Sequence, residues 1–186
     1  MNKRFKEVRE RIKQDDFDYD DEGRAVVKIN ITDAESLLSV YNDDGMEIIS
    51  EDTAEFIDNL TKPIPPKKDI QLQISCDSYT EDKESVYKSA ITNYYVNEFA
   101  HRDEMLRDRV RVSGVLTLVS IICFMILFFM YKWNVPDIAC VLMEVIAWVF
   151  AWETVDQFFL QRYFIKKKQY KELQIIYAKI TFKRLK

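Results

Sequence analysis

One long uncharged segment constrains this chain more than any other feature of its sequence. Residues 112–131 read VSGVLTLVSIICFMILFFMY and contain no charged side chain. About twenty apolar residues in a helix span the hydrocarbon core of a bilayer, which is roughly 30 Å thick. The sequence therefore predicts a transmembrane helix at 112–131. The alternative is a buried helical hairpin in a soluble protein, which would rarely leave so long a stretch without charge.

A second apolar segment follows after a short link. Residues 138–160 are largely apolar, although Glu144, Glu153 and Asp156 interrupt them. Their length also suits a membrane-spanning helix. We therefore expect a transmembrane hairpin over 112–160.

Basic residues gather on one side of this expected hairpin. They precede the first span and follow the second, whereas the link between the spans carries only Lys132. The flanking set comprises Arg102, Arg107, Arg109, Arg111, Arg162, Lys166, Lys167, Lys168 and Lys171. Because lysine and arginine are enriched in cytoplasmic loops, we expect a multi-pass protein of the plasma (inner) membrane with both termini in the cytoplasm.

The charge of the chain is divided unevenly. Residues 1–111 hold 17 Lys and Arg against 26 Asp and Glu, and residues 112–186 hold 10 against 5. An acidic domain argues against binding to nucleic acid, which requires a basic face. The basic tail predicts contact with the bilayer and with anionic lipid headgroups, through the inner-boundary positions Arg109, Arg111, Arg162, Lys166, Lys167 and Lys168.

Residues 1–23 are expected to form a basic helix and an acidic linker. The helical pattern over 2–14 has a narrow apolar stripe, so this helix either lies on the inner membrane surface or rests on its own domain. Residues 15–22 read DDFDYDDE. No register of this segment supplies both the glycine and the final glutamate of a calcium-binding loop, so we interpret it as a linker.

Residues 24–111 predict a cytoplasmic α/β domain. Apolar and polar side chains alternate over 25–32 and over 70–76, which is typical of half-buried strands. Between these strands, Asp33 and Ser50 are suited to cap two helices.

The first of these helices is expected at 34–41, and the second ends before the prolines that begin at Pro63. From about residue 81 the helical pattern continues into the first span. It forms either one helix as far as 131 or two helices with a break near 101–103.

The C-terminal segment, 161–186, is expected to return to this domain. Its helical pattern continues to about residue 173, and alternation resumes over 176–183. With both termini in the cytoplasm, this strand can join the other two. The predicted fold class is therefore α+β: a small cytoplasmic sheet of two N-terminal strands and one C-terminal strand, with helices, fused to a two-helix transmembrane hairpin.

The sequence resembles a set of uncharacterised bacterial two-transmembrane-helix proteins with a small cytoplasmic α/β domain. The resemblance is carried by Trp148-Val149, Trp152-Glu153 with Asp156, and the basic run Lys166-Lys167-Lys168. A weaker likeness is the helix that starts at Ser50-Glu51-Asp52 and ends at Lys62-Pro63-Ile64-Pro65. The resemblance implies this architecture and no particular activity.

Polar side chains inside the spans call for an explanation, because a charge at the bilayer centre costs about 2.5–3.5 kcal/mol. Glu153, Asp156 and Gln157 share a face near the inner boundary, and Asp156 is within reach of Arg109 or Arg111. This group either holds the hairpin together or forms part of a cation or proton path.

Glu144 lies nine residues before Glu153 and on the opposite side of the helix. The first span offers only apolar side chains near its depth, so we expect Glu144 to face a subunit interface or a watery path. Trp148 and Trp152 form an i,i+4 pair, and we expect them to pack within the hairpin or between subunits.

Motifs for catalysis and cofactor binding are absent from the sequence. The single histidine, His101, precedes the inner boundary; the three glycines are isolated, and the three cysteines lack metal-ligand spacing. We therefore expect no enzyme, cofactor or metal. The predicted function is an oligomeric membrane anchor or scaffold that presents its cytoplasmic domain to a protein partner. The alternative is an oligomeric ion channel or membrane-disrupting effector whose second span lines the path.

Overall fold

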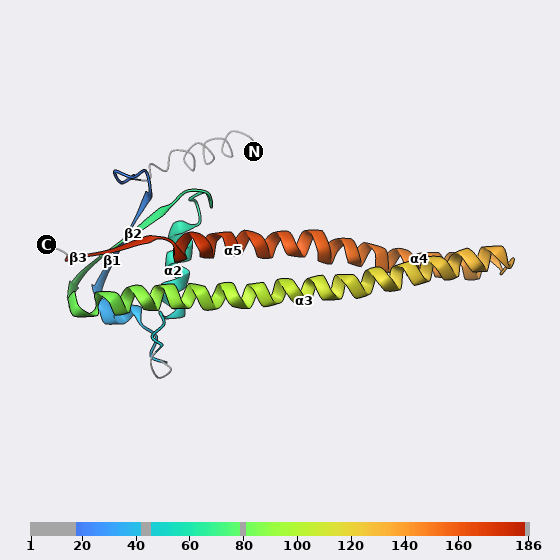
Figure 1. The fold of residues 1–186 in the computed structure, drawn as a ribbon, viewed down its shortest axis with the longest axis horizontal. Helices are drawn as coiled ribbons and strands as arrows, with labels where there is room; N and C mark the ends of the chain where they lie inside the picture. The colour runs from blue at the N-terminus through green and yellow to red at the C-terminus, as the bar shows by residue number, and fades with distance from the viewer. Residues whose placement is uncertain (1–17, 42–45, 79–80, 185–186) are drawn as a thin grey trace, which may run out of the picture. The chain divides into compact units, whose positions relative to one another are not determined.

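A computed structural model describes residues 18–41, 46–78 and 81–184 of the chain (Figure 1). The helix predicted over 2–14 lies outside these residues. Contacts divide the chain into two units. The α/β unit comprises Met1–Phe99 and Tyr170–Lys186, and the hairpin unit comprises Ala100–Gln169.

The α/β unit is built on a sheet of three parallel strands. These are β1 (Ala25–Asp33), β2 (Ile70–Ser78) and β3 (Lys179–Arg184), and β2 lies in the centre. The register aligns Leu72 with Ile180 and Ile74 with Phe182. The predicted α+β class is confirmed, and so is the prediction that a C-terminal strand completes the sheet.

Alternation along each strand separates a buried face from a polar one. On β1, Val27 and Ile29 are buried whereas Lys28 and Asn30 are exposed. Side chains of successive strand residues point to opposite faces, so this pattern places one face of the sheet against the core. Burying each such side chain stabilises the fold by about 1.5–3 kcal/mol.

A short 3-10 helix and one α-helix connect β1 to β2. The helix expected at 34–41 is a single 3-10 turn, Ala34–Leu37, which the Asp33 side chain caps. It ends there because Leu38 returns to extended backbone and pairs with Ile49. Helix α2 (Glu51–Thr61) then begins at its predicted cap, where the Ser50 hydroxyl accepts from the Thr53 N–H at 3.3 Å.

Helix α3 (Glu84–Lys132) is continuous, without the alternative break at 101–103. Its first turns supply large buried side chains to the core, among them Tyr87, Ile91 and Tyr95. The Tyr95 hydroxyl donates to the Ala54 carbonyl at 3.2 Å and to the Asp58 carboxylate at 3.0 Å. Burial and the nearby Asp58 charge raise the pKa of Tyr95 well above its ordinary value, so this phenol stays a donor.

Two side chains of helix α5 (Arg162–Ile176) bind the loop after α2. The Lys171 ammonium donates to the carbonyls of Thr61, at 2.9 Å, and of Ile64. The Gln174 amide donates to the Pro65 carbonyl at 2.9 Å. A positive charge at the C-terminal end of α2 satisfies carbonyls that have no partner within that helix. Lys171 is therefore a structural residue as well as part of the basic flank.

The described end of the acidic segment makes contacts with the strands. Asp18 forms an ion pair with Lys28 of β1, and Glu22 lies 3.6 Å from the Lys179 ammonium of β3. Asp20 accepts from the Arg24 backbone N–H at 2.8 Å, which closes a turn through Gly23. The positive φ of 77° at Gly23 is a conformation that glycine adopts without strain.

In the hairpin unit, α3 ends at a turn that its sequence specifies. Asn134 adopts a φ of 53°, and the Val135 N–H donates back to the Met130 carbonyl at 3.1 Å. This is the Schellman arrangement, in which asparagine is a common substitute for glycine. Helix α4 (Asp137–Val155) starts directly after Pro136, and the π-helix η3 (Asp156–Gln161) follows it.

The two arms of the hairpin meet along positions spaced seven residues apart. On α3 these are Leu106, Ser113, Ser120 and Leu127, and on α4 they are Cys140 and Ala147, all of them buried. A seven-residue repeat is typical of left-handed helix packing, and small residues let two backbones approach closely. Between two of these positions the Ser120 hydroxyl of α3 donates to the Ala147 carbonyl of α4 at 3.5 Å.

Both arms are long and apolar enough to cross a membrane. The helical stretches Glu84–Lys132 and Asp137–Ile176 each contain such a segment. Only 22 % of the first segment and 11 % of the second are buried within the chain, whereas the core helix of a soluble protein would be mostly buried. The structure thus agrees with a membrane hairpin and disfavours the buried alternative.

Replacing Phe182 by alanine tests the contribution of β3. Phe182 is buried, and its ring packs at 5.8 Å from that of Tyr87. We expect the α/β unit to lose about 3 kcal/mol, the lower end of the range for Phe→Ala in a core. Hydrogen exchange of the β1 and β2 amides in the full detergent-solubilised chain measures this loss. The exposed neighbour Lys183→Ala is the control, and equal protection in both variants would contradict the role of β3.

Candidate functional site

A polar cluster of Arg109, Glu153 and Gln157 links α3 to η3 and to the last turn of α4. The Arg109 guanidinium donates to the Gln157 side-chain oxygen at 2.8 Å. The Gln157 amide in turn donates to the Glu153 carboxylate at 2.7 Å. Gln157 therefore connects the Arg109 guanidinium to the Glu153 carboxylate through two hydrogen bonds. These bonds lower the free-energy cost of placing Glu153 in an apolar segment.

Asp156 takes no part in this cluster, although the sequence places it within reach of Arg109 or Arg111. Its carboxylate accepts from the Gln161 amide at 3.2 Å, and Arg111 donates to Asp108 at 3.2 Å. The π-helix η3 explains the difference, because its hydrogen bonds join residues five apart and bring Asp156 beside Gln161. Nothing in the sequence around 156–161 indicates this change of helix type.

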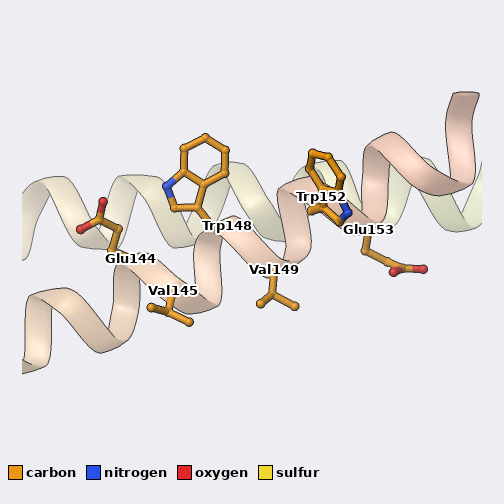
Figure 2. A pocket seen from close by; sticks show the side chains of 6 residues that line it. All are labelled: Glu144, Val145, Trp148, Val149, Trp152 and Glu153. Carbon is orange, nitrogen blue, oxygen red and sulfur yellow. The ribbon is translucent and has the colours of Figure 1, made fainter.

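An open groove of about 530 Å³ runs along one face of α4 (Figure 2). Glu144, Trp148 and Trp152 rise from one side of the helix, and Val145, Val149 and Glu153 from another. All six belong to α4. The two acids that helical periodicity places on opposite sides therefore stand at opposite ends of one groove.

Glu144 is half-buried and lies at the edge of the hairpin interface, one turn after buried Cys140 and one turn before buried Ala147. Within the described part of the chain, its carboxylate has no hydrogen-bond or ion-pair partner. The Tyr131 phenol near the end of α3 is close enough for the two groups to interact electrostatically. The sequence does not indicate that Tyr131 lies near Glu144, because backbone positions alone assign the two residues to different depths in the bilayer. Helical side chains lean toward the N-terminus and extend about one turn back from their own backbone.

The two tryptophans are held differently. The Trp148 ring meets that of Phe124 edge-to-face, with centroids 6.2 Å apart, so α3 fixes its orientation. Even so, Trp148 is 59 % exposed and Trp152 is 70 % exposed. Most of both indole surfaces is therefore available to lipid or to a bound molecule.

The basic residues after η3 point largely to the outside. Lys166, Lys167 and Lys168 are exposed, and the Arg162 guanidinium lies 5.4 Å from the centroid of the Phe158 ring. Such an arrangement leaves the three ammonium groups accessible to phosphate groups of lipids. Binding to anionic headgroups stays a prediction.

Comparison with known proteins found no matching family model, no similar curated protein and no similar solved structure. Among the residues that the structure describes, no three His, Cys, Asp or Glu side chains are arranged to hold a metal ion. The three cysteines are free and buried. The function must therefore be argued from the geometry of the two units.

A double-mutant cycle tests whether Arg109 and Gln157 act together. We expect Arg109→Ala and Gln157→Leu to be non-additive, with a coupling of about 0.6–1.7 kcal/mol, as for polar contacts between membrane helices. Unfolding of the hairpin in mixed detergent and sodium dodecyl sulfate measures it. Arg111→Ala combined with Gln157→Leu is the control and should be additive, since Arg111 contacts Asp108. Equal coupling in both cycles would contradict the cluster.

Proposed function

We propose that this chain is a two-pass membrane anchor that holds its α/β unit at the inner membrane surface and acts as a scaffold rather than an enzyme. The connectivity of the sheet carries this proposal. Strand β2 precedes both arms of the hairpin and β3 follows them, yet the two strands pair directly. Each end of the hairpin is thus attached to the same folded unit.

The pairing of β2 with β3 also constrains how many times the chain can cross a membrane. Strands in one sheet lie in one compartment, so the chain between them crosses a membrane an even number of times. Two crossings agree with the two apolar helical stretches. The basic residues on both flanks favour the cytoplasm as that compartment, and the plasma (inner) membrane as the location.

Cysteine labelling in intact cells tests the topology. The natural Cys76 and Cys140 are 0 % and 1 % exposed, so a thiol reagent should reach neither. We expect a membrane-impermeant maleimide to label Lys132→Cys, in the link, because that position is exposed and faces out. Lys183→Cys, exposed on β3, should react only after permeabilisation. The reverse order of labelling would contradict the proposed orientation.

A second candidate function is an oligomeric ion channel lined by α4. The observation in its favour is that Glu144 and Glu153 both line the groove on this helix. A cation path requires that several copies bring these faces together, and self-association is itself a prediction of the sequence.

Two measurements distinguish a scaffold from a channel: the mass of the protein in nanodiscs and the ion flux that it produces in liposomes. A scaffold predicts no flux in liposomes, whatever the mass of the protein in nanodiscs. A channel predicts an oligomer whose cation flux falls at least tenfold in Glu144→Gln, because the amide removes the charge and keeps the shape. Flux that is unchanged by this substitution would contradict a path through the α4 face.

A further inference from the structure

The groove on α4 contains an acid, Glu144, for which neither apolar span offers a counter-charge. Residues 112–131 and 138–161 contain no lysine, arginine or histidine. Glu153 is already bonded to Gln157, whereas Glu144 has no such partner within the described residues. A second copy in the same orientation would bring only its own Glu144 to this depth. Charge complementarity therefore calls for a cation from outside the protein.

Aromatic rings stand beside this acid. Trp148 lies one helical turn from Glu144 on the same side of α4, and Trp152 continues the row (Figure 2). The faces of indole rings attract cations, most strongly where water is excluded. Phe124 fixes the Trp148 ring from the side, which leaves it oriented before anything binds.

We propose that this groove binds an amphipathic organic cation, of the quaternary ammonium or phosphonium class. The charge lies between the Glu144 carboxylate and Trp148, and the apolar groups cover Val145, Val149 and Trp152. The proposal rests on the proposed placement of α4 in a membrane, where such a cation reaches the groove through the lipid.

The chemistry of the groove favours an organic over an inorganic cation. Calcium takes six to eight oxygen ligands, and magnesium requires near-ideal octahedral geometry. Glu144 alone supplies two carboxylate oxygens that are not bonded to another described residue. An organic cation with a dispersed charge needs no such shell, because apolar and aromatic contacts replace its weakly held water.

Binding of two ions of equal shape and opposite charge tests the site. The full chain in nanodiscs is titrated with tetraphenylphosphonium and, separately, with tetraphenylborate, and binding to empty nanodiscs is subtracted from each. We expect the wild type to bind the cation at least tenfold more tightly than the anion. Glu144→Gln should bind the cation about tenfold more weakly than the wild type, the effect of removing one charge pair from an apolar site.

Asp137→Asn is the matched control, since Asp137 is an exposed acid of α4 outside the groove, and it should bind like the wild type. Equal binding of both ions by the wild type would overturn the site without need of any variant. Cation binding by Glu144→Gln that equals binding by the wild type would also overturn the site. The same holds if the wild type forms a dimer that binds no cation. A chain that fails to enter nanodiscs would overturn the proposed membrane placement as well, whereas one that enters and does not discriminate overturns the cation site alone.

Discussion

The pairing of β3 with β2 is the contact on which the rest of this architecture depends. It joins residues more than a hundred positions apart, with the whole hairpin between them. Strand β3 adds two buried side chains, Ile180 and Phe182, to the apolar core beneath this small sheet. The α/β unit therefore cannot be complete until the second arm of the hairpin has been made and the chain has returned. Assembly of the sheet is thereby coupled to formation of the hairpin.

Serine hydroxyls and carboxylates occupy different positions in the hairpin. Serines and other small residues lie in the buried interface, where the Ser120 hydroxyl donates to the Ala147 carbonyl across the interface. The carboxylates of Glu144 and Glu153 line the open groove on α4, at the edge of this interface. A carboxylate there can meet a group from outside the chain, whereas an acid inside the interface would have to be satisfied by the partner helix alone. The interface thus provides structure and the groove on α4 remains for binding.

Patterns of short range in the sequence predicted most of the fold. Alternation located the strands, and Ser50 located the start of α2, because both depend on neighbouring residues alone. The parts that escaped prediction depend on distant partners. Leu38 leaves the helical pattern because it pairs with Ile49, and Lys171 caps α2 from a helix far along the chain. At the candidate site, the sequence identified Glu144 and the tryptophans, but not the groove that they share.

The π-helix η3 decides which polar side chains meet where α4 passes into α5. Its hydrogen bonds join residues five apart, and Asp156 accepts from the Gln161 amide at 3.2 Å. The Arg109 guanidinium of α3 is thereby left to Gln157, which donates in turn to Glu153. Beyond η3, Lys166, Lys167 and Lys168 are exposed whereas Gln169 is buried. A local change of helix type thus assigns Arg109 to the Gln157–Glu153 pair rather than to the acid that lies nearer in the sequence to the basic run.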